Sequence, residues 1–352
     1  MRRKSSIAAT AVFFAMTATA FAQSEGDGRP GKEIRILIGS GVGGGYDAYA
    51  RVAAQFIGKH MPGNPAVVVQ NVPGAGGLKL ANYMAQIAPR DGTEIAITNR
   101  NLIAAPLLKM VEASNVQYDS AKFVWLANLT TDVSFFIART ASGIRTIEDA
   151  RNREVIVGST SSADNNGMFP YIANNLLGTK FKVVTGYPSS SALALAIDRG
   201  EIDGVVGFSW SSIQVQRPQW LRDHEVSLVL QLGLLPLPEA RDVPMIIDKA
   251  RNETDRKAME LIATLNTLGR PFFGPPQMTP QSSKTWRDAF TELVKDEAFL
   301  TQMQRQKLDV SFLDGEHLQE TVQHMIDVTP DVAEAARKSL EPSSTPVQTF
   351  TK

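Results

Sequence analysis

Residues 34–51, IRILIGSGVGGGYDAYAR, decide the fold of the first half of the chain. The opening IRILIG is a short apolar run rich in β-branched residues, which predicts a strand. A glycine loop follows, and the spacing of apolar residues over 46–61 predicts a helix. A strand joined to a helix by a tight glycine loop is the repeating unit of an α/β fold.

The same unit occurs twice more along the chain. A strand at 66–70 leads into the glycine-rich segment NVPGAGG (71–77) and a helix over 78–88. A third strand at 94–98 leads into a helical stretch over 102–111. This alternation predicts a parallel sheet with right-handed crossovers. Because the carboxyl ends of parallel strands share one edge, both glycine loops are expected at that edge.

A second series of strands and helices fills the rest of the chain. Residues 123–139 predict two extended segments, and the last hundred residues are mainly helical. The other expected elements are strands at 154–158, 182–185, 202–208, 227–233 and 270–273, and helices at 164–177 and 189–199. We expect an α/β protein with lobe I over 23–128, lobe II over 129–235, and a return to lobe I with C-terminal helices over 236–352.

The first 22 residues have the pattern of a secretory signal peptide. Arg2, Arg3 and Lys4 precede an uncharged apolar run over 7–20, which ends at the small-x-small site Ala20-Phe21-Ala22. The run is shorter than the roughly 20 residues that a spanning helix needs. We expect cleavage after Ala22, a periplasmic location, and a mature chain long enough for two lobes.

Composition disfavours several classes of function. Loss of the three basic residues in 1–22 leaves 33 basic against 36 acidic residues, a net charge of −3 that is not typical of a nucleic-acid-binding protein. The chain has no Cys, which excludes disulfides, thiolate metal sites and a Cys nucleophile. The four His residues have no metal-binding spacing, and no hydrolase motif is present. We therefore expect no catalytic residues, no metal and no cofactor.

Residues 39–44 (GSGVGG) match the dinucleotide-binding pattern G-x-G-x-x-G. That fingerprint also needs an acidic residue near the end of the second strand, but 48–90 contain no Asp or Glu and four basic residues. A glycine loop before a helix N-terminus instead suits a carboxylate, since free N–H groups and a partial positive charge face it. The alternative is that the glycines only make tight turns.

Two further polar groups have a structural and a functional interpretation. Asp47 is either a first-turn acid that complements the helix dipole or a residue of the binding pocket. Residues 159–162 (STSS) follow a strand and offer hydroxyl donors to a ligand, or Ser162 or Asp164 caps the next helix, and both can hold. An enzyme that uses Asp47 and Asp203 as acid and base is a competing hypothesis.

With these motifs in hand, the chain resembles the tripartite tricarboxylate transporter receptors, also called the Bug family of periplasmic solute-binding proteins. The matching segments are 34–51, 67–84, 91–97, 155–162 and 186–204. The chain departs from the family pattern at 186–189 (GYPS) and over 243–263. Both departures bear on which ligand is bound and on the surface offered to membrane subunits.

The resemblance implies a two-lobed fold like that of type II periplasmic binding proteins, with each lobe a mainly parallel sheet flanked by helices. It implies a monomeric receptor that binds a small organic carboxylate and delivers it to the membrane subunits of the transporter. Carried over to this chain, the ligand-binding set is Gly43, Gly44, Gly45, Tyr46, Asp47, Asn71, Gly74, Ala75, Gly76, Gly77, Thr98, Asn99, Ser159, Thr160, Ser161, Ser162, Tyr187 and Asp203. A binding protein that serves a sensor is the alternative, which a neighbouring permease gene would disfavour.

Overall fold

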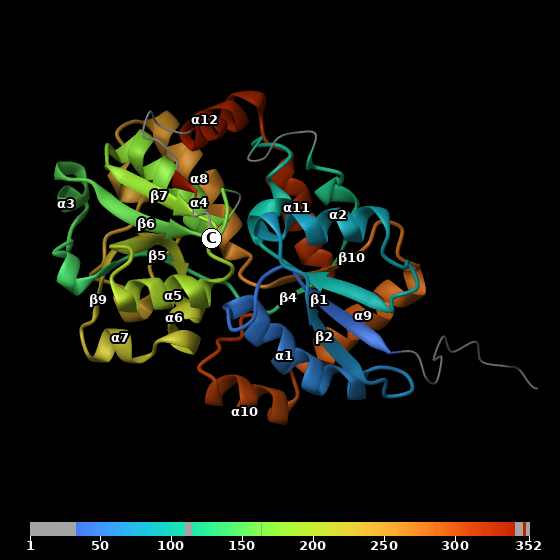
Figure 1. Cartoon of the computed structure of the whole chain (residues 1–352). Coiled ribbons are helices and arrows are strands. Elements are labelled where there is room, and N and C mark those ends of the chain that lie inside the picture. The colour runs from blue at the N-terminus through green and yellow to red at the C-terminus, as the bar shows by residue number, and fades with distance from the viewer. Residues whose placement is uncertain (1–32, 110–114, 163, 342–347, 350–352) are drawn as a thin grey trace, which may run out of the picture.

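The computed structural model describes residues 33–109, 115–162, 164–341 and 348–349, so the predicted signal peptide at 1–22 lies outside the described residues. The chain forms two six-stranded sheets with helices on both faces (Figure 1). Each sheet is the centre of one lobe, which we call the first and second lobe in the order of their first strands. Both sheets combine parallel and antiparallel pairs, so the predicted two-lobed α/β fold is confirmed, with mixed sheets.

The first sheet has the strand order β11-β4-β10-β3-β1-β2. Its strands are β1 (Ile34–Ile38), β2 (Val67–Asn71), β3 (Glu94–Ile97), β4 (Val124–Asn128), β10 (Pro271–Gly274) and β11 (Leu313–Asp314). β1 pairs in parallel with β2 and β3, whereas β10 runs antiparallel to β3 and β4. The parallel part is the strand-loop-helix repeat that the sequence predicts.

The second sheet has the strand order β12-β7-β6-β8-β5-β9. Its strands are β5 (Ser134–Arg139), β6 (Val155–Ser159), β7 (Phe181–Thr185), β8 (Gly204–Ser209), β9 (Val226–Leu232) and β12 (Gln348–Thr349). β6 pairs in parallel with β7 and β8, and β5 runs antiparallel to β8 and β9. The expected strand at 227–233 is therefore β9, an edge strand of this sheet.

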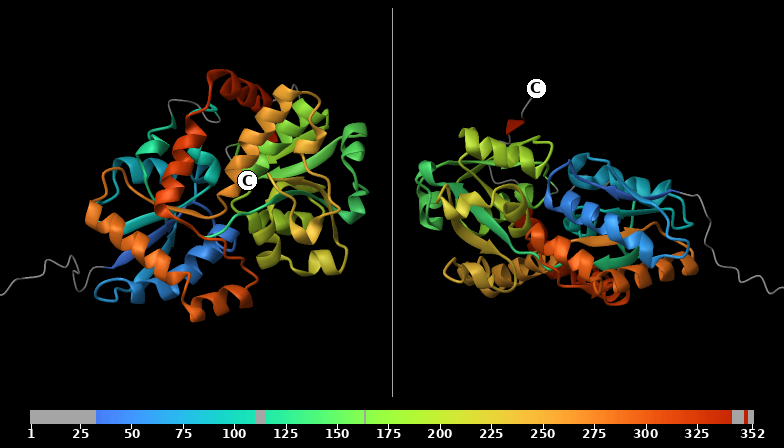
Figure 2. Two further views of the ribbon diagram at one scale, coloured as in Figure 1. Left: turned by 180° about the vertical axis from the view of Figure 1, so that it is seen from behind. Right: turned by 90° about the horizontal axis from the view of Figure 1, so that it is seen from below.

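Helices cover both faces of each sheet (Figure 2). On the first lobe these are α1 (Gly45–Ile57), α2 (Leu78–Gln86), α9 (Pro280–Leu293), α10 (Glu297–Arg305) and α11 (Gly315–Ile326). On the second lobe they are α3 (Ile147–Asn152), α4 (Asn165–Ile172), α5 (Ser190–Arg199), α6 (Trp210–Gln216), α7 (Gln219–Arg222), α8 (Glu253–Thr267) and α12 (Pro330–Leu340). Within the described residues, no helix is long and apolar enough to cross a membrane.

The C-terminal third differs from the expected return to lobe I over 236–352. The chain continues on the second lobe through α8, which packs beside α12, and α12 also contacts α4. β10, α9, α10, β11 and α11 do lie on the first lobe, whereas β12 pairs with β7 of the second. Since helix packing partners lie far apart in sequence, the helical pattern alone does not say which lobe each helix covers. The boundaries at 128/129 and 235/236 stay a proposal.

The segment after β3 also differs from the expected helix over 102–111. A 3-10 helix over Arg100–Ile103 is followed by turns up to residue 109. Pro106 lacks a backbone N–H, which removes one helical hydrogen bond from this stretch. The residues from 110 to 114 lie outside the described part of the chain.

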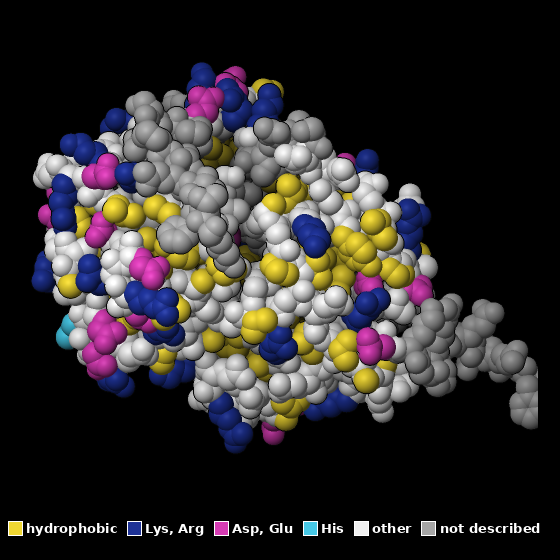
Figure 3. Space-filling model, in the orientation of Figure 1, with side chains coloured by type: hydrophobic (Ala, Val, Ile, Leu, Met, Phe, Trp, Pro, Cys, Tyr) yellow, Lys and Arg dark blue, Asp and Glu magenta, His cyan; other side chains and the backbone are white. Residues whose placement is uncertain are grey.

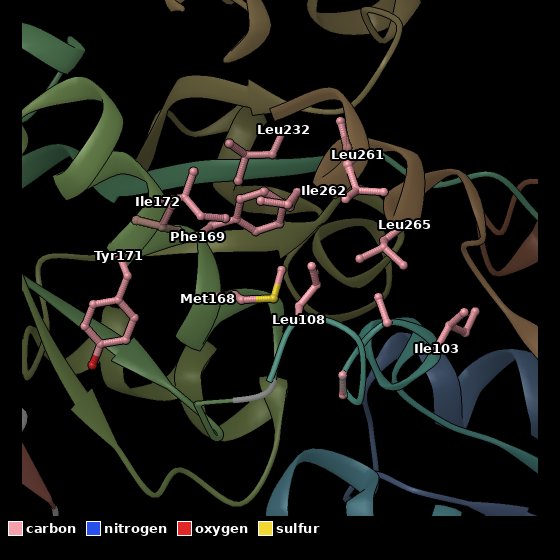
Figure 4. Packing of buried hydrophobic residues seen from close by; sticks show 14 of the residues in the cluster. Ile103, Leu108, Met168, Phe169, Tyr171, Ile172, Leu232, Leu261, Ile262 and Leu265 are labelled. Atoms are coloured by element: carbon pink, nitrogen blue, oxygen red, sulfur yellow. The ribbon is translucent and has the colours of Figure 1, made fainter. Parts of the chain in front are cut away.

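One hydrophobic cluster continues from lobe to lobe. Ile103 and Leu108, which follow β3, pack with Met168 and Phe169 of α4 and with the α8 residues Leu261, Ile262 and Leu265 (Figure 4). A second cluster lies under α1, α9 and α10 of the first lobe, and Val215 of α6 packs against it. A third lies under α5, α6 and α7 of the second lobe. The lobes therefore share a core on the side of α8.

Candidate functional site

A cavity of about 390 Å³ lies between the two lobes, at the carboxyl ends of parallel strands from both sheets. The segments that line it follow β1, β2 and β3 of the first sheet and β6, β7 and β8 of the second. The lining residues are Gly39, Ser40, Gly44, Gly45, Tyr46, Pro73, Gly74, Ala75, Gly76, Asn99, Arg100, Thr160, Asp164, Asn165, Asn166, Gly186, Tyr187, Pro188, Ser189, Ser190, Gly207, Phe208, Ser209, Ser212 and Arg270. Crevices at this edge of α/β sheets are where small ligands bind.

Half of the eighteen predicted ligand-binding residues line this cavity. They are Gly44, Gly45, Tyr46, Gly74, Ala75, Gly76, Asn99, Thr160 and Tyr187. The other predicted residues are Gly43, Asp47, Asn71, Gly77, Thr98, Ser159, Ser161, Ser162 and Asp203, which are outside the lining set. Most of this second group make contacts that hold the lining loops in place.

Asp47 anchors the first glycine loop (39–45). Its buried carboxylate accepts hydrogen bonds from Gly43 N, Arg51 Nε and Asn71 Nδ2, each at 2.9 Å. Burial acts to raise the pKa of Asp47, but the hydrogen bonds from Arg51, Gly43 and Asn71 outweigh it and lower the pKa below its ordinary value. Asp47 thus positions the loop through its backbone.

Asn71 ties the end of β2 to the same loop. Its Nδ2 also donates to Ser40 O at 3.0 Å, and its Oδ1 accepts from Arg51 Nη2 at 2.8 Å. Asp47, Arg51 and Asn71 form one network behind the loop, on the side away from the cavity lining. The network therefore supports the first glycine loop, at the sheet edge where the sequence predicts carboxylate binding. Two of its members, Asp47 and Asn71, are predicted site residues.

The second glycine loop (71–77) contributes four consecutive lining residues, Pro73, Gly74, Ala75 and Gly76. Gly76 adopts φ +64°, where a side chain is strained, and it lies against Ser161 of the second lobe. Thr98 lies between Gly39 and Gly77 and packs the two glycine loops against each other. The loop thereby faces both the cavity and the opposite lobe.

Residues 159–162 of the second lobe divide between lining and support. Ser159 is buried, and its hydroxyl lies 2.9 Å from Ser161 O and 3.1 Å from Asn166 Oδ1. Thr160 lines the cavity, and its backbone N–H donates to Asn166 Oδ1 at 2.9 Å. Ser162 is exposed. The residue that caps α4 is Asp164, whose side chain accepts from Asn165 N, whereas Ser159 bonds within its own loop and to Asn166. Thr160 is the residue of this segment that lines the cavity.

Tyr187 and Asp203 lie at opposite ends of the second sheet. Tyr187 lines the cavity, and burial raises the pKa of its phenol, with a smaller contribution from Glu201. Asp203 precedes β8, while the cavity meets the other end of that strand at 207–209. The Asp203 carboxylate accepts a hydrogen bond from Ile156 N at 2.9 Å. Asp47 and Asp203 both stand outside the cavity lining, so the site does not pair them as acid and base.

Two buried arginines border the cavity, and neither is among the predicted residues. Arg100 is 1% exposed, and its Nη2 donates to Ser134 Oγ at 3.0 Å. Burial lowers the pKa of Arg100. Its position directly after Thr98 and Asn99, at the carboxyl end of β3, is a signal that sequence reasoning could have used.

Arg270 reaches the same edge from the antiparallel strand β10. Its Nη2 lies 3.0 Å from the Asp132 carboxylate and also donates to Ser211 Oγ. The guanidinium lies over the rings of Tyr46 and Tyr49, at 4.6 and 5.1 Å from their centroids. A β-carbon on Gly45 would overlap Arg270, so α1 begins with a glycine where this side chain passes. Sequence reasoning missed Arg270 because its place depends on the direction of β10.

The charges around the cavity favour an anion. Arg270 pairs with the buried Asp132 carboxylate, whereas Arg100 forms no ion pair among the described residues, and Asp164 lines the second-lobe side. Burial raises the pKa of Asp164, against smaller opposing contributions from Thr160 and Asn165. Across the face seen in Figure 3, basic and acidic side chains are interspersed. Among the described residues, no group of three or more His, Asp and Glu side chains could hold a metal ion.

The lobes touch each other at the rim of the cavity. Val42 O in the first glycine loop accepts a hydrogen bond of 3.4 Å from Ser191 Oγ at the start of α5. Gly41 in the same loop packs against the backbone of Pro188. Together with the Gly76–Ser161 contact, these contacts close the two lobes over the cavity on the side away from α8.

Comparison with proteins of known structure identifies this architecture. The structure of the periplasmic binding protein BugD matches with a TM-score of 0.69 at 17% identity, over 88% of this chain and 98% of that chain. A TctC solute-binding protein from Polaromonas matches with a TM-score of 0.57 at 16% identity, over 88% and 99%. The fold is that of the Bug and TctC solute-binding proteins. A third structure, MatC of Rhodopseudomonas palustris with bound malate, shares the Bug and TctC fold, with a TM-score of 0.64 at 18% identity over 87% and 100%.

Two curated proteins have sequences similar to parts of this chain. A UPF0065 protein of Bordetella bronchiseptica is 28% identical over 189 residues, 51% of this chain and 54% of the relative. A UPF0065 protein of Cupriavidus necator is 32% identical over 129 residues, 36% of this chain and 37% of the relative. The chain thus spans about half or less of the length of these relatives. No family model matches the chain. The resemblance seen in the sequence is confirmed by this fold and these relatives.

Proposed function

We propose that the protein is a periplasmic solute-binding receptor that captures a small carboxylate-bearing solute between its lobes and delivers it to a tripartite tricarboxylate-type transporter. The observation that carries the proposal is the cavity between the lobes, which combines two glycine loops with the buried guanidinium groups of Arg100 and Arg270. Backbone N–H groups and guanidinium groups are the donors that carboxylates prefer.

The size and position of the cavity support a small ligand. Its volume of about 390 Å³ is within the range of small-molecule sites. Its lining comes from both lobes, so a ligand there contacts each of them and favours the closed form over an open one. MatC, which shares the fold, is solved with malate, a dicarboxylate. A binding role without catalysis agrees with the solute-binding proteins that share the fold.

Delivery to membrane subunits, the periplasmic location and the monomeric state are the finer parts of the proposal. They rest on the resemblance and on the pattern of residues 1–22, which predicts cleavage after Ala22. Intact-mass analysis of periplasmic protein should give a chain that begins at Gln23, and retention of residues 1–22 would contradict export by this signal.

Thermal unfolding with a panel of solutes tests the ligand class. Mono-, di- and tricarboxylates are compared with neutral sugars and with amines, each at several concentrations. A bound carboxylate should stabilise the fold by about 2.7 kcal/mol at a hundredfold excess over its dissociation constant. Stabilisation by sugars or amines, with no effect of any carboxylate, would refute the proposed function.

A further inference from the structure

One of the two arginines that border the cavity, Arg100, has no ion-pair partner among the described residues. Arg100 and Arg270 border the cavity, and each is 1% exposed. Arg270 has a counter-charge in Asp132, with which it forms a buried ion pair at 3.0 Å. Arg100 forms no ion pair within the described residues, where its only side-chain hydrogen bond goes to the neutral hydroxyl of Ser134.

The donors of Arg100 are mostly unused. Its Nε and Nη1 are buried and have no hydrogen-bond partner among the described residues. A buried cation whose donors lack partners costs free energy, because water no longer solvates it. Structures retain such groups where function requires them, since burial of an unpaired charge gives no stability in return.

The nearest carboxylates are already engaged elsewhere. Asp132 pairs with Arg270 and accepts a hydrogen bond of 2.8 Å from Ser211 Oγ. Asp164 accepts hydrogen bonds from the Thr160 hydroxyl and from Asn165 N. Neither carboxylate lies within ion-pair distance of Arg100 in the described part of the chain. Arg100 therefore has no direct ionic partner within the described residues, and its side chain is free to pair with an anion from outside the fold.

We propose that an ionised group of the ligand is the counter-ion of Arg100, so that Arg100 selects anionic solutes against neutral ones of the same shape. The proposal rests on the proposed function and deepens it, because the two glycine loops alone offer backbone donors that also suit a neutral carbonyl oxygen. Arg100 adds a full charge at the hinge side of the cavity, beside Ser134 at the start of β5.

A structural role for Arg100 and a role as the partner of an anionic ligand predict different effects of its replacement on the stability of the ligand-free protein. If Arg100 held the core together, its replacement would destabilise the ligand-free protein. If its counter-ion is the ligand, a neutral residue of similar length removes an unbalanced charge and leaves the ligand-free protein at least as stable. The affinity for an anion and the stability of the ligand-free protein then change in different directions.

The experiment measures affinity by calorimetry for pairs of probes with the same skeleton, adipate with adipamide and benzoate with benzamide. Wild type, Arg100→Gln and the control Arg217→Gln are compared, since Arg217 pairs with Asp198 on the second lobe and does not border the cavity. Wild type and the control should bind the carboxylate at least about tenfold more tightly than the amide. Arg100→Gln should reduce that ratio at least about tenfold and keep or raise the ligand-free melting temperature.

The ratio of the two affinities decides the outcome. An unchanged ratio in Arg100→Gln would overturn the proposal, whatever happens to the melting temperature. If Arg100→Gln does not fold, the ratio of the carboxylate and amide affinities is measured on Arg100→Met, which has an apolar side chain of similar length. If wild type binds none of the carboxylates in the wider panel, the proposed function fails first. A wild type that binds carboxylates and amides equally contradicts the role of Arg100 alone.

Discussion

A β-carbon on Gly76 would overlap the hydroxyl oxygen of Ser161, and these two residues belong to different lobes. The contact brings the second glycine loop of the first lobe directly against the loop after β6 of the second. Gly76→Val should therefore hinder closure as well as strain a backbone at φ +64°. We expect loss of carboxylate binding, measured by calorimetry, with a native circular dichroism spectrum.

Gly63 offers a matched control for this substitution. It also has positive φ, at +79°, but nothing lies within 4 Å of the place where its β-carbon would stand. Gly63→Val should cost a similar backbone strain of about 1–2 kcal/mol and leave affinity unchanged. Normal binding by Gly76→Val would show that the Gly76–Ser161 contact is irrelevant to capture of the ligand.

The Asp47 carboxylate should make the stability of the protein sensitive to acid. Because hydrogen bonds hold its folded-state pKa below the unfolded value of about 3.9, its contribution is present above that pH and is lost as pH falls through the folded-state pKa. Asp47→Asn should cost about 1–3 kcal/mol at pH 7, since the amide keeps one acceptor oxygen and its NH2 group then faces a donor of Gly43, Arg51 or Asn71. Urea unfolding should show this difference narrowing below pH 4.

Asp288→Asn is the control for the acid effect, because Asp288 forms an exposed pair with Lys284 on α9. Exposed pairs contribute at most about 1 kcal/mol. Equal stability of Asp47→Asn and wild type at pH 7 would contradict the anchoring role of Asp47.

The buried pair of Asp132 and Arg270 should be costly to break. Both side chains are almost fully buried, at 3% and 1% exposure, so Asp132→Asn leaves an uncompensated guanidinium between the lobes. We expect a loss of about 3–5 kcal/mol in urea unfolding. The partly exposed pair of Asp198 and Arg217 provides the comparison, and Asp198→Asn should lose at most about 1 kcal/mol. Similar losses for the two variants would contradict this account of Arg270.

Ligand binding should change the overall shape of the protein. The chain crosses between the lobes at 129–133, at 268–270 ahead of β10, and at 327–329 between α11 and α12, so these segments are the expected hinges. The core shared by Ile103, Leu108 and α8 should hold the lobes together on one side while the side of the glycine loops opens. Small-angle scattering should give a smaller radius of gyration with ligand. Tight binding without compaction would place the site within one lobe.

The local parts of this fold could be predicted from the sequence, and the non-local parts could not. The apolar runs and glycine loops of 34–51 and 66–88 predict strands, turns and helices that depend on neighbouring residues. Arg270 reaches the cavity because β10 runs antiparallel to β3, and that direction is decided by packing between distant segments. The lobe that α8 covers is likewise decided by contacts between residues far apart in the sequence. Arg100 lies one residue beyond the predicted pair of Thr98 and Asn99, so its omission reflects the assumption that backbone donors suffice.

Native mass spectrometry of the exported protein, freshly purified from the periplasm, shows directly whether the chain carries a small carboxylate. The account predicts one small organic acid bound to each chain, identified by fragmentation of the released molecule, and absent from Gly76→Val prepared in the same way. Wild type stripped of this acid by mild unfolding and refolding should bind it again without altering it. A neutral or cationic molecule in its place, or chemical conversion of the acid on rebinding, would contradict a receptor for small carboxylates.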